Sequence, residues 1–555
     1  MTVLNLIIAG EAGQGLLTIG EILTRTLVRH GLYVCVNQDY QSRIRGGNNS
    51  FAIKVSDTNV QAPAETFDVL VALNQESVDI YKQRLNQGGI IIADADLEAT
   101  DPAVRVPFSD LGEKKYTNVA AAGIAGVAVG LDTSVLSQTV HDHFKKPELA
   151  DKNQEVLDKA IEWARENASE KTGKLSKTSR GERLMMSGNQ AIALGAMSAG
   201  VKFYSFYPMT PATSIALALI KYAEKTGIVV EQAEDEIAAI NMALGASFAG
   251  APAMTGTSGG GFALMVEGLS LAGMTETPVV IALAQRPAPG TGLPTRTEQA
   301  DLEFALHAGH GEFPRAVLAP GTPEQCFELT RKAFHLAEKY QGPVIIMTDQ
   351  FLADSYRAVE PFDLESAEPV TVGNSGEDDP DYKRYRFTDN GVSPRRIPGW
   401  SRSLVVADSD EHFEDGHITE DHEVRTNMVD KRLNKLEGLK SEIVPPDYEG
   451  EENPELLLLT WGSTIGAVRE AADKLKSEGE KVATLHFSQV WPIVPEQFTG
   501  YIENAKRVVS VEGNATAQMA RLLRRESGIE IKEHVLRYDG LPVTPEQILR
   551  DTGKA

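Results

Sequence analysis

The stretch Tyr207-Pro208-Met209-Thr210-Pro211-Ala212-Thr213 constrains this chain more than any other, because two prolines bracket one threonine. The apolar run before it, residues 201–206, indicates a buried strand, and residues 214–220 indicate a helix. Each proline fixes its own φ and keeps the residue before it out of the helical region. The loop should therefore be rigid and hold the Thr210 hydroxyl at the carboxyl end of a strand, where α/β sheets bind ligands. The alternative is a threonine that only caps the following helix.

Periodicity along the rest of the chain predicts a multi-domain α/β protein built from layers with parallel sheets. A length of 555 residues is too long for one core and suggests three or four domains. Near-continuous apolar strands alternate with helices after residue 183, which is typical of a parallel sheet covered on both faces. A polar stretch at 166–182 indicates a linker. We predict domains at 1–175, 183–440 (with an acidic, loop-rich extension from about 361) and 452–555.

Charge and cysteine content limit the partners. The net charge is −24 and the pI is near 5.0, which argues against nucleic-acid binding and against this chain as the docking surface for acidic ferredoxin. Two cysteines cannot form a four-cysteine iron–sulfur site, so a cluster would belong to another chain. Without a signal peptide or an apolar run of membrane length, a cytoplasmic protein is expected, with no membrane partner. His412, His417 and His422 match no metal-ligand spacing, so we predict a solvated loop there and no metal site.

A glycine-rich loop follows the first predicted strand. Residues 10–15 read Gly-Glu-Ala-Gly-Gln-Gly, a spacing that differs from the dinucleotide fingerprint. Gly13 and Gly15 would still let backbone N–H groups approach a phosphate or carboxylate at a helix N-terminus. A tight strand-to-helix turn without a ligand is an equally good interpretation.

Three acids, Glu234, Asp235 and Glu236, open the helical pattern that begins at residue 237. Acids are expected in a first helical turn because of the helix dipole, which accounts for two of them. Glu236 differs, because it heads an apolar stripe formed by Ala239, Ile240, Ala243 and Leu244. A carboxylate on such a stripe is costly unless a partner bonds it.

Several of these motifs resemble the 2-oxoacid:ferredoxin oxidoreductases, which use thiamine diphosphate. The loop at 207–213 resembles the family's Tyr-Pro-Ile-Thr-Pro-Ser-Ser/Thr signature, and residues 291–296 match its Thr-Gly-Leu-Pro-Thr-Arg motif. Residues 258–262 resemble Thr-Ser-Gly-Pro-Gly-Phe, with Gly260 in the proline's place. The first 175 residues, with the loops at 10–15 and 42–47, resemble the γ domain, and the last hundred resemble a transketolase C-terminal-like domain. Within residues 512–518, Ala517 replaces a glycine that the family often has, and no function is assigned there.

The resemblance implies a role for each matching residue. Glu236 would be the catalytic glutamate that shares a proton with the thiamine aminopyrimidine. Arg296 would contact the 2-oxoacid carboxylate together with Thr210, with Arg286 as the other candidate arginine on the same loop. The remaining residues would line the cofactor or bind coenzyme A: Tyr207, Pro208, Ser258 and Gly259 for the cofactor, and the loop of Gly13 and Gly15 for coenzyme A.

The chain contains no Gly-Asp-Gly, the motif with which thiamine enzymes hold diphosphate and Mg²⁺. The resemblance therefore implies a fused γα chain, the α subunit, whose β partner carries the diphosphate site, Mg²⁺ and an iron–sulfur cluster. An (αβ)₂ heterotetramer with ferredoxin docking on β is expected. The implied reaction is reversible, coenzyme A-dependent oxidative decarboxylation of 2-oxoglutarate, whose reverse is a step of the reductive tricarboxylic acid cycle. The alternatives are a pyruvate or broad 2-oxoacid enzyme, a non-redox transketolase-type enzyme, and a nucleotide-binding regulatory protein.

Overall fold

The computed structural model of the chain describes residues 3–41, 46–99, 103–168, 175, 183–365, 368–373, 379–400 and 402–554. The chain forms two compact units, the first from Met1–Ser187, Asp354–Pro361 and Val543–Ala555, and the second from Gly188–Ala353 and Phe362–Pro542. Nearly all of the predicted linker at 166–182 beyond residue 168, and most of the segment 42–47, lie outside the described residues. The domain boundaries given above stay predictions.

The first unit contains an eight-stranded mixed sheet with the order β6-β5-β4-β1-β3-β2-β14-β7. Its strands are β1 (Val3–Ala12), β2 (Tyr33–Asp39), β3 (Gly46–Ser56), β4 (Phe67–Ala72), β5 (Leu85–Asp94), β6 (Ala103–Val106), β7 (Leu184–Met186) and β14 (Arg357–Val359). The strands β1, β4, β5 and β6 run parallel, whereas β3 pairs antiparallel with both β1 and β2. The sequence predicted layers of strands and helices here, but it did not predict the antiparallel pairing of β3 with β1 and β2.

Helices cover both faces of this sheet. The first unit contains the helices α1 (Leu16–Arg29), α2 (Gln75–Tyr81), α3 (Phe108–Leu111), α4 (Thr117–Ala128), α5 (Thr133–His143) and α6 (Pro147–Asn167), with the 3₁₀ turns η1 (Lys82–Arg84) and η2 (Lys114–Tyr116). The last helix of the chain, α18 (Pro545–Asp551), also belongs to this unit. Alternate residues of β1 point to opposite faces. Leu6 and Ile8 join a core with α1, α4 and α6, while Ile7 and Ala9 join a smaller one with α2.

The second unit is built on a seven-stranded sheet with the order β18-β12-β13-β11-β10-β8-β9. Its strands are β8 (Phe203–Phe206), β9 (Val229–Gln232), β10 (Ala253–Thr257), β11 (Val279–Gln285), β12 (Ala316–Leu318), β13 (Pro343–Asp349) and β18 (Gln489–Trp491). All are parallel except β18, which pairs antiparallel with β12. The six parallel strands match the parallel sheet predicted from the apolar runs.

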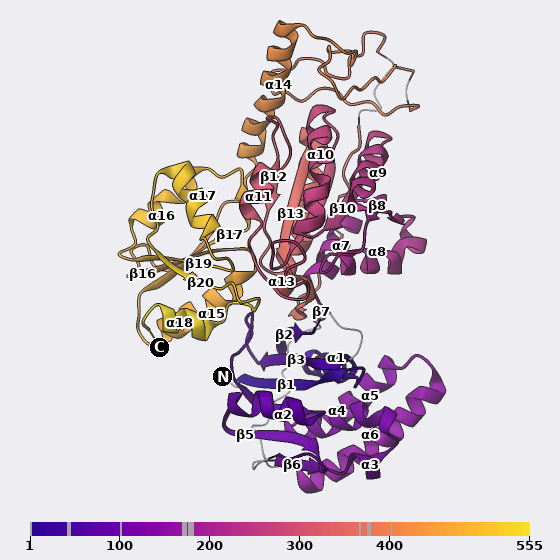
Figure 1. Ribbon diagram of the computed structural model, residues 1–555, viewed down its shortest axis with the longest axis vertical. Helices are drawn as coiled ribbons and strands as arrows, with labels where there is room; N and C mark the ends of the chain where they lie inside the picture. The colour runs from indigo at the N-terminus through magenta and orange to yellow at the C-terminus, as the bar shows by residue number, and fades with distance from the viewer. Residues whose placement is uncertain are drawn as a thin grey trace. The chain divides into compact units, whose positions relative to one another are not determined.

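Helices lie on both faces of the seven-stranded sheet, with α9 and α10 on one face and α7, α8 and α12 on the other (Figure 1). Their bounds are α7 (Gly188–Ser198), α8 (Thr213–Thr226), α9 (Glu236–Phe248), α10 (Gly259–Met274), α11 (Leu302–His307), α12 (Pro323–Tyr340), α13 (Gln350–Asp354) and α14 (His422–Ser441). Because every parallel strand ends at the same edge, the loops after these strands meet there.

A five-stranded sheet with the order β15-β17-β16-β19-β20 completes the second unit. Its elements are β15 (Asp447–Glu449), β16 (Leu456–Trp461), β17 (Val482–Phe487), β19 (Val508–Glu512), β20 (Glu533–Leu536), α15 (Ile465–Ser477), α16 (Thr499–Glu503), α17 (Gln518–Ser527), η3 (Gly462–Thr464) and η4 (Pro495–Gln497). Buried side chains such as Leu459, Phe487 and Trp461 belong to the same apolar core as Ile281 and Phe262 of the larger sheet. The two sheets therefore share one core.

The acidic extension differs from the solvated loop predicted for it. His412 has no exposed surface, and its ring lies 4.0 Å, centroid to centroid, from the buried Tyr385. The segment ends in the 20-residue helix α14, which is capped by Asp421. The prediction failed because a few buried anchors spaced among turns and charges give no periodic pattern. His417 is exposed, as expected of a loop, and His422 is also exposed but is the first residue of α14.

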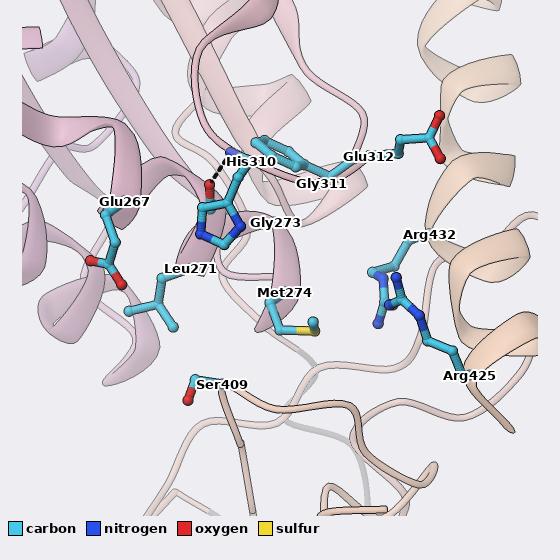
Figure 2. A pocket seen from close by; sticks show the side chains of 12 residues that line it. Glu267, Leu271, Gly273, Met274, His310, Gly311, Glu312, Ser409, Arg425 and Arg432 are labelled. Atoms are coloured by element: carbon cyan, nitrogen blue, oxygen red, sulfur yellow. Dashed lines mark hydrogen bonds between the residues drawn. The ribbon is translucent and has the colours of Figure 1, made fainter. Parts of the chain in front are cut away.

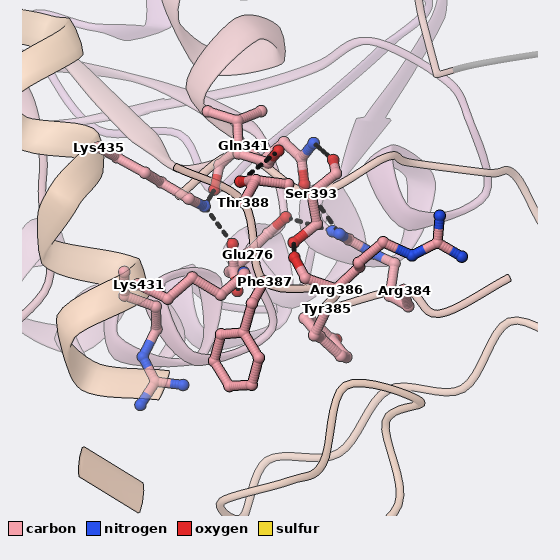
Figure 3. A network of polar contacts seen from close by, with 12 residues as sticks. Glu276, Gln341, Arg384, Tyr385, Arg386, Phe387, Thr388, Ser393, Lys431 and Lys435 are labelled. Carbon is pink, nitrogen blue, oxygen red and sulfur yellow. Dashed lines mark hydrogen bonds and ion pairs between the residues drawn. The ribbon is translucent and has the colours of Figure 1, made fainter. Parts of the chain in front are cut away.

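A buried charge cluster holds the extension against the rest of its unit. Glu276, which follows α10, accepts from Lys431 Nζ at 2.6 Å and forms an ion pair with Lys435. Figure 3 shows both lysines reaching Glu276 from α14. Arg384 donates to the Glu276 carbonyl at 2.7 Å and to Gln341 Oε1 at 2.8 Å. Buried charges are tolerated only when paired, as these are.

No helix among the described residues is both long enough and apolar enough to cross a membrane.

Candidate active site

Four adjacent parallel strands bring most of the predicted site residues to one edge of the seven-stranded sheet. In the order β11-β10-β8-β9, Arg286 follows β11, Ser258 follows β10, the loop at 207–213 follows β8, and Glu236 follows β9. These residues are far apart in sequence, and only the strand order makes them neighbours. The edge is the one at which open α/β sheets bind ligands.

Glu236 is a buried carboxylate at the first position of α9. Asp235 caps the helix by accepting from Ala238 N at 2.7 Å, and both Asp235 and Glu234 are exposed. Glu236 is 3% exposed, and its Oε1 has no hydrogen-bond partner. An unpaired buried carboxylate oxygen costs free energy. Glu236 is therefore buried while its two acidic neighbours are exposed, as the apolar stripe predicted.

The surroundings of Glu236 bring three loops together. A Cβ added to Gly261 would lie 2.6 Å from Glu236 Oε1 and would also strike the Thr257 hydroxyl, so only glycine fits there. Thr257 Oγ1 in turn lies 3.7 Å from the sulfur of Met209. The carboxylate, the end of β10 and the loop at 207–213 thus form one site. Thr257 was not predicted, although its place at the end of a buried strand was a usable signal.

Thr210 is bonded to an arginine and does not cap the helix. Its carbonyl accepts from Arg286 Nη1 at 2.8 Å, and the N-cap of α8 is Ala212, with no side-chain capping bond. The Thr210–Pro211 peptide bond is cis. Asn189 Nδ2 donates to the Pro211 carbonyl at 2.9 Å and holds the loop from the start of α7. The rigid loop predicted from the two prolines is therefore present, and the capping alternative is wrong.

Tyr207 and Pro208 are exposed, with 40% of the Tyr207 surface accessible to solvent. Both precede Met209, whose sulfur reaches Thr257. They therefore stand at the rim of the site, where a second molecule can reach them.

Ser258 and Gly259 form the N-terminus of α10. Ser258 is the N-cap by position, but its hydroxyl makes no capping bond and is buried without a partner. A Cβ on Gly259 would lie 2.5 Å from Asp301 Oδ2, so the glycine makes room for that carboxylate. A turn with a helix cap was the alternative to a site-lining loop, and the missing capping bond speaks against it.

Asp301 is a member of this site that the motif analysis did not assign. Its Oδ2 is buried and has no hydrogen-bond partner. Burial, together with the nearby Glu298, raises its pKa to about 6 against the opposing influence of Arg286. Burial also lowers the pKa of Arg286, and Asp301 opposes this shift. The available signal was an acid that closes the arginine-containing segment.

The two candidate arginines lie in different surroundings. Arg286 is joined to the Thr210 loop, whereas the stem of Arg296 lies against Gly540, where an added Cβ would be 3.1 Å from Arg296 Cβ. Thr297 N donates to the Gly540 carbonyl at 3.1 Å. We call residues 286–301 the arginine loop. One of its arginines contacts the β8 loop, and the other contacts the segment after β20.

The glycine loop at 10–15 belongs to the first unit. Gly13 and Gly15 have φ values of 95° and 83°, and Gly15 is the N-cap of α1. Gln14 fixes the turn by accepting from Glu11 N at 2.7 Å and donating to the Leu73 carbonyl at 3.2 Å. The predicted strand–loop–helix geometry is present at the carboxyl end of β1.

A cavity of about 210 Å³ lies at the other end of α10, between its last turns, the loop after α11 and the extension (Figure 2). Ser258 precedes this 16-residue helix, whose length is about 24 Å. The arginines that line the cavity, Arg425 and Arg432, are bonded to Glu411 at 2.6 and 2.8 Å. Because that carboxylate already neutralises part of their charge, the cavity offers no distinct ligand site.

Two segments match known families. Residues 194–431 match "Pyruvate flavodoxin/ferredoxin oxidoreductase, thiamine diP-bdg", and residues 5–163 match "Pyruvate ferredoxin/flavodoxin oxidoreductase". The first match contains Glu236 and the loop at 207–213, and the second contains the glycine loop. The fold and the site therefore place the chain in the class of thiamine-dependent oxidoreductases that act with ferredoxin or flavodoxin.

The chain belongs to the 2-oxoacid:ferredoxin oxidoreductases, as an α subunit. It is 32% identical to the 2-oxoacid:ferredoxin oxidoreductase subunit alpha of a Sulfolobus species, over 98% of this chain and 96% of that one. It is 30% identical to the 2-oxoglutarate oxidoreductase subunit KorA of Mycobacterium tuberculosis, over 98% and 90%. A solved 2-oxoglutarate:ferredoxin oxidoreductase from Magnetococcus marinus, with 2-oxoglutarate, coenzyme A and succinyl-CoA bound, superposes with a TM-score of 0.93 at 32% identity, over 100% of this chain and 99% of that one.

The predicted family, enzyme class and α/β fold are thereby confirmed. A nucleotide-binding regulatory protein and a transketolase-type transferase were the alternatives from other classes. Matches over nearly the whole length of oxidoreductase subunits favour the family over both.

Proposed function

We propose that this chain is the α subunit of a coenzyme A-dependent 2-oxoglutarate:ferredoxin oxidoreductase and that it supplies the ring half of the thiamine site. The observation that carries this proposal is the buried Glu236 carboxylate. Its Oε1 has no hydrogen-bond partner and lies in the same site as Thr257 and Met209. A ligand that brings a donor to Oε1 would remove the cost of the unpaired atom. A protonated aminopyrimidine nitrogen is such a donor.

The residues present fit one half of the cofactor only. Glu236 suits the ring, and the exposed Tyr207 and Pro208 with Ser258 and Gly259 would line it. For the diphosphate and Mg²⁺ the sequence offers no Gly-Asp-Gly, and its two cysteines, which are too few for a four-cysteine cluster, are both buried. The β partner is therefore proposed to hold the diphosphate, Mg²⁺ and the iron–sulfur cluster.

The chain's own residues then have separate tasks. Thiamine diphosphate, when bound, supplies the nucleophilic carbon and the electron sink for decarboxylation. Glu236 would hold a proton between its Oε1 and the ring nitrogen, which is general acid–base work. Arg296 would bind the carboxylate of the 2-oxoacid, while Arg286 supports the Thr210 loop through the Thr210 carbonyl. In the overall reaction the 2-oxoacid loses CO₂, its acyl group forms a thioester with coenzyme A, and two electrons leave singly to ferredoxin.

Exposed apolar side chains on the site-bearing elements support a partner subunit. Solvent reaches 49–61% of the surfaces of Leu217 on α8, Ile237 on α9, Leu264 on α10 and Leu293 on the arginine loop. Large exposed apolar side chains on the elements that carry a site are typical of an interaction surface. We assign this surface to the β subunit in an (αβ)₂ assembly. Ferredoxin would dock on β, because this chain carries a net charge of −24.

The glycine loop is the proposed contact for coenzyme A. Gly13 and Gly15 bring no side chain of their own to the turn between β1 and the N-terminus of α1. Backbone N–H groups in such a turn bind phosphate groups. The Magnetococcus marinus structure, which holds 2-oxoglutarate, supports 2-oxoglutarate as the substrate. The broader 2-oxoacid name of the Sulfolobus relative supports a pyruvate or mixed specificity as the second candidate.

Glu236→Gln tests the proposal, with Glu234→Gln as the matched control two residues earlier on an exposed position. Both variants are purified in complex with the β partner and assayed for coenzyme A-dependent viologen reduction over a panel of 2-oxoacids. Glu236→Gln should lower turnover about 10²-fold or more with the complex intact, and Glu234→Gln should leave it unchanged. Wild-type turnover by Glu236→Gln at saturating thiamine diphosphate would refute the proposed role.

A further inference from the structure

One glutamine joins the arginine loop to the five-stranded sheet through three hydrogen bonds. Gln299 is 2% exposed, and its backbone N–H donates to the Gly513 carbonyl at 2.6 Å. Its Oε1 accepts from Gly513 N at 2.8 Å, and its Nε2 donates to the Trp461 carbonyl at 3.1 Å. Trp461 ends β16 and Gly513 follows β19, so Gln299 is bonded to two neighbouring strands at once.

A second glutamine reaches the same loop from the opposite direction. Gln518, the first residue of α17, donates from Nε2 to the Ala300 carbonyl at 2.8 Å and accepts from Glu303 N at 3.0 Å. Gln518 is 9% exposed. The end of the arginine loop is therefore held by one side chain of the loop itself and by one side chain of α17.

The segment that holds the loop is itself well fixed. Glu512 has no exposed surface and accepts from Met519 N at 2.9 Å and Ala520 N at 3.1 Å, at the N-terminus of α17. A carboxylate at a helix N-terminus is favourable. Gly513 permits the close approach, because a Cβ there would lie 3.1 Å from Gln299 Oε1. Residues 512–518 therefore form a rigid support.

The arginine loop needs such a support. Before α11 it contains no regular secondary structure, and its middle part, residues 288–293, is exposed. Ordering such a segment costs conformational entropy, and an arginine that must be ordered during binding loses affinity. Arg296 precedes Gln299 by three residues, and between them Thr297 Oγ1 donates to Asp349 Oδ1 at 3.2 Å.

We infer that Gln299 and Gln518 are positioning residues, through which the five-stranded C-terminal sheet holds Arg296 in place for the carboxylate of the 2-oxoacid. The inference rests on the proposed function, in which Arg296 binds that carboxylate. It gives residues 512–518, to which the sequence assigned no function, a role in substrate affinity. Neither glutamine touches the reacting atoms.

The test uses Gln299→Ala and Gln518→Ala in the complex with the β partner. The matched control is Gln489→Ala, because Gln489 is also 2% exposed. Its side chain likewise accepts from a backbone N–H group, that of Val444 at 3.0 Å, and donates to the carbonyls of Trp491 and Pro492. We expect Gln299→Ala to raise the KM for the 2-oxoacid about tenfold, with kcat within about threefold of wild type. Gln518→Ala should raise the same KM to a smaller degree. Gln489→Ala should leave KM within about twofold of wild type.

Two further readouts separate positioning from general loss of structure. Backbone hydrogen exchange in peptides covering 286–301 should become faster in Gln299→Ala and Gln518→Ala but not in Gln489→Ala. In an Arg296→Met background, Gln299→Ala should raise KM less than twofold further, because the two residues act as a unit.

Equal exchange of the loop in Gln299→Ala and Gln489→Ala would overturn the inference, as would a full additional effect on KM in the Arg296→Met background. Exchange does not depend on turnover. A failure here is therefore distinguishable from a failure of the proposed function, which the Glu236→Gln assay reports separately.

Discussion

At the scale of single residues, burial gives ordinary acids and bases unusual properties. Glu236, Asp301 and Ser258 each keep a buried polar atom without a partner in one region, and they come from three different loops. Unpaired buried polar groups destabilise a fold, and they persist mainly where function requires them. The site therefore lowers stability, and its residues can be tested by stability as well as by activity.

Asp301→Asn is expected to stabilise the chain in a pH-dependent way. The pKa of Asp301 is raised to about 6, so ionisation is less favourable in the folded state, and the stability of the native chain falls as pH rises from about 4 to about 6. The difference corresponds to about 3 kcal/mol. Asparagine removes this penalty, so the variant should exceed the native chain by about 1–3 kcal/mol at pH 8, with a shrinking advantage towards pH 4.5. Urea unfolding at both pH values measures this. An advantage independent of pH would contradict it, and Asp96→Asn on an exposed loop should change nothing.

Arg296→Met is expected to weaken 2-oxoacid use far more than thiamine diphosphate binding. Loss of a charged bidentate contact should cost about 2–4 kcal/mol of transition-state binding, measured as kcat/KM over the oxoacid panel. Arg286→Met is the comparison. Because Arg286 donates to the Thr210 carbonyl, its loss should disturb the Thr210 loop and lower kcat as well. The opposite pattern, with KM raised by Arg286→Met alone, would make Arg286 the carboxylate-binding arginine.

At the scale of elements, the extension is held by charge as much as by apolar packing. Although burial raises the pKa of Glu276, Lys435, Lys431 and Arg384 outweigh it and hold that pKa well below its usual range. Burial lowers the pKa of Lys435 to about 8, against the attraction of Glu276. One carboxylate thus compensates the buried charges of two lysines on successive turns of α14.

Glu276→Gln should therefore destabilise the second unit strongly. The change leaves two buried ammonium groups without their counter-charge, which costs about 3–5 kcal/mol. Glu530→Gln, at an exposed ion pair with Arg524 on the same unit, should cost no more than about 1 kcal/mol. Denaturant unfolding of the two variants gives the comparison, and equal losses would show that the cluster contributes no more than a surface pair.

At the scale of the whole molecule, the proposed site is incomplete in this chain. The two sheets of the second unit share a core, which fixes the loops of the proposed ring half-site. The sequence has no Gly-Asp-Gly motif, and its two cysteines are too few for a four-cysteine cluster. The site-bearing helices expose apolar side chains. Under the proposed function, the assembled enzyme would depend on a second chain for the diphosphate end of the cofactor and for electron transfer.

The purified chain alone should be colourless and inactive, and it should bind thiamine diphosphate weakly. The charged, metal-bridged end of the cofactor makes its strongest contacts, and this chain offers only the ring contacts. Anaerobic addition of the β partner should restore brown colour, cofactor binding and coenzyme A-dependent viologen reduction together. Stoichiometric iron on the isolated chain, or oxoacid oxidation by it, would contradict this division.

The sequence by itself determined the local structures and the family. Two prolines fixed the loop around Thr210, glycines allowed the turn at 10–15, and apolar runs gave the parallel strands, because φ/ψ limits and periodicity are local properties. The apolar stripe also singled out Glu236 among three acids.

Tertiary structure decided which residues from distant parts of the chain contact each other. Four features depend on strand order and on close approaches between distant segments. They are the bond from Arg286 to the Thr210 carbonyl, the place of Asp301 against Gly259, the joining of β14 and β7 to the first sheet, and the burial of His412. No local pattern encodes such contacts, because they form only when the sheets and their shared core have placed those segments side by side.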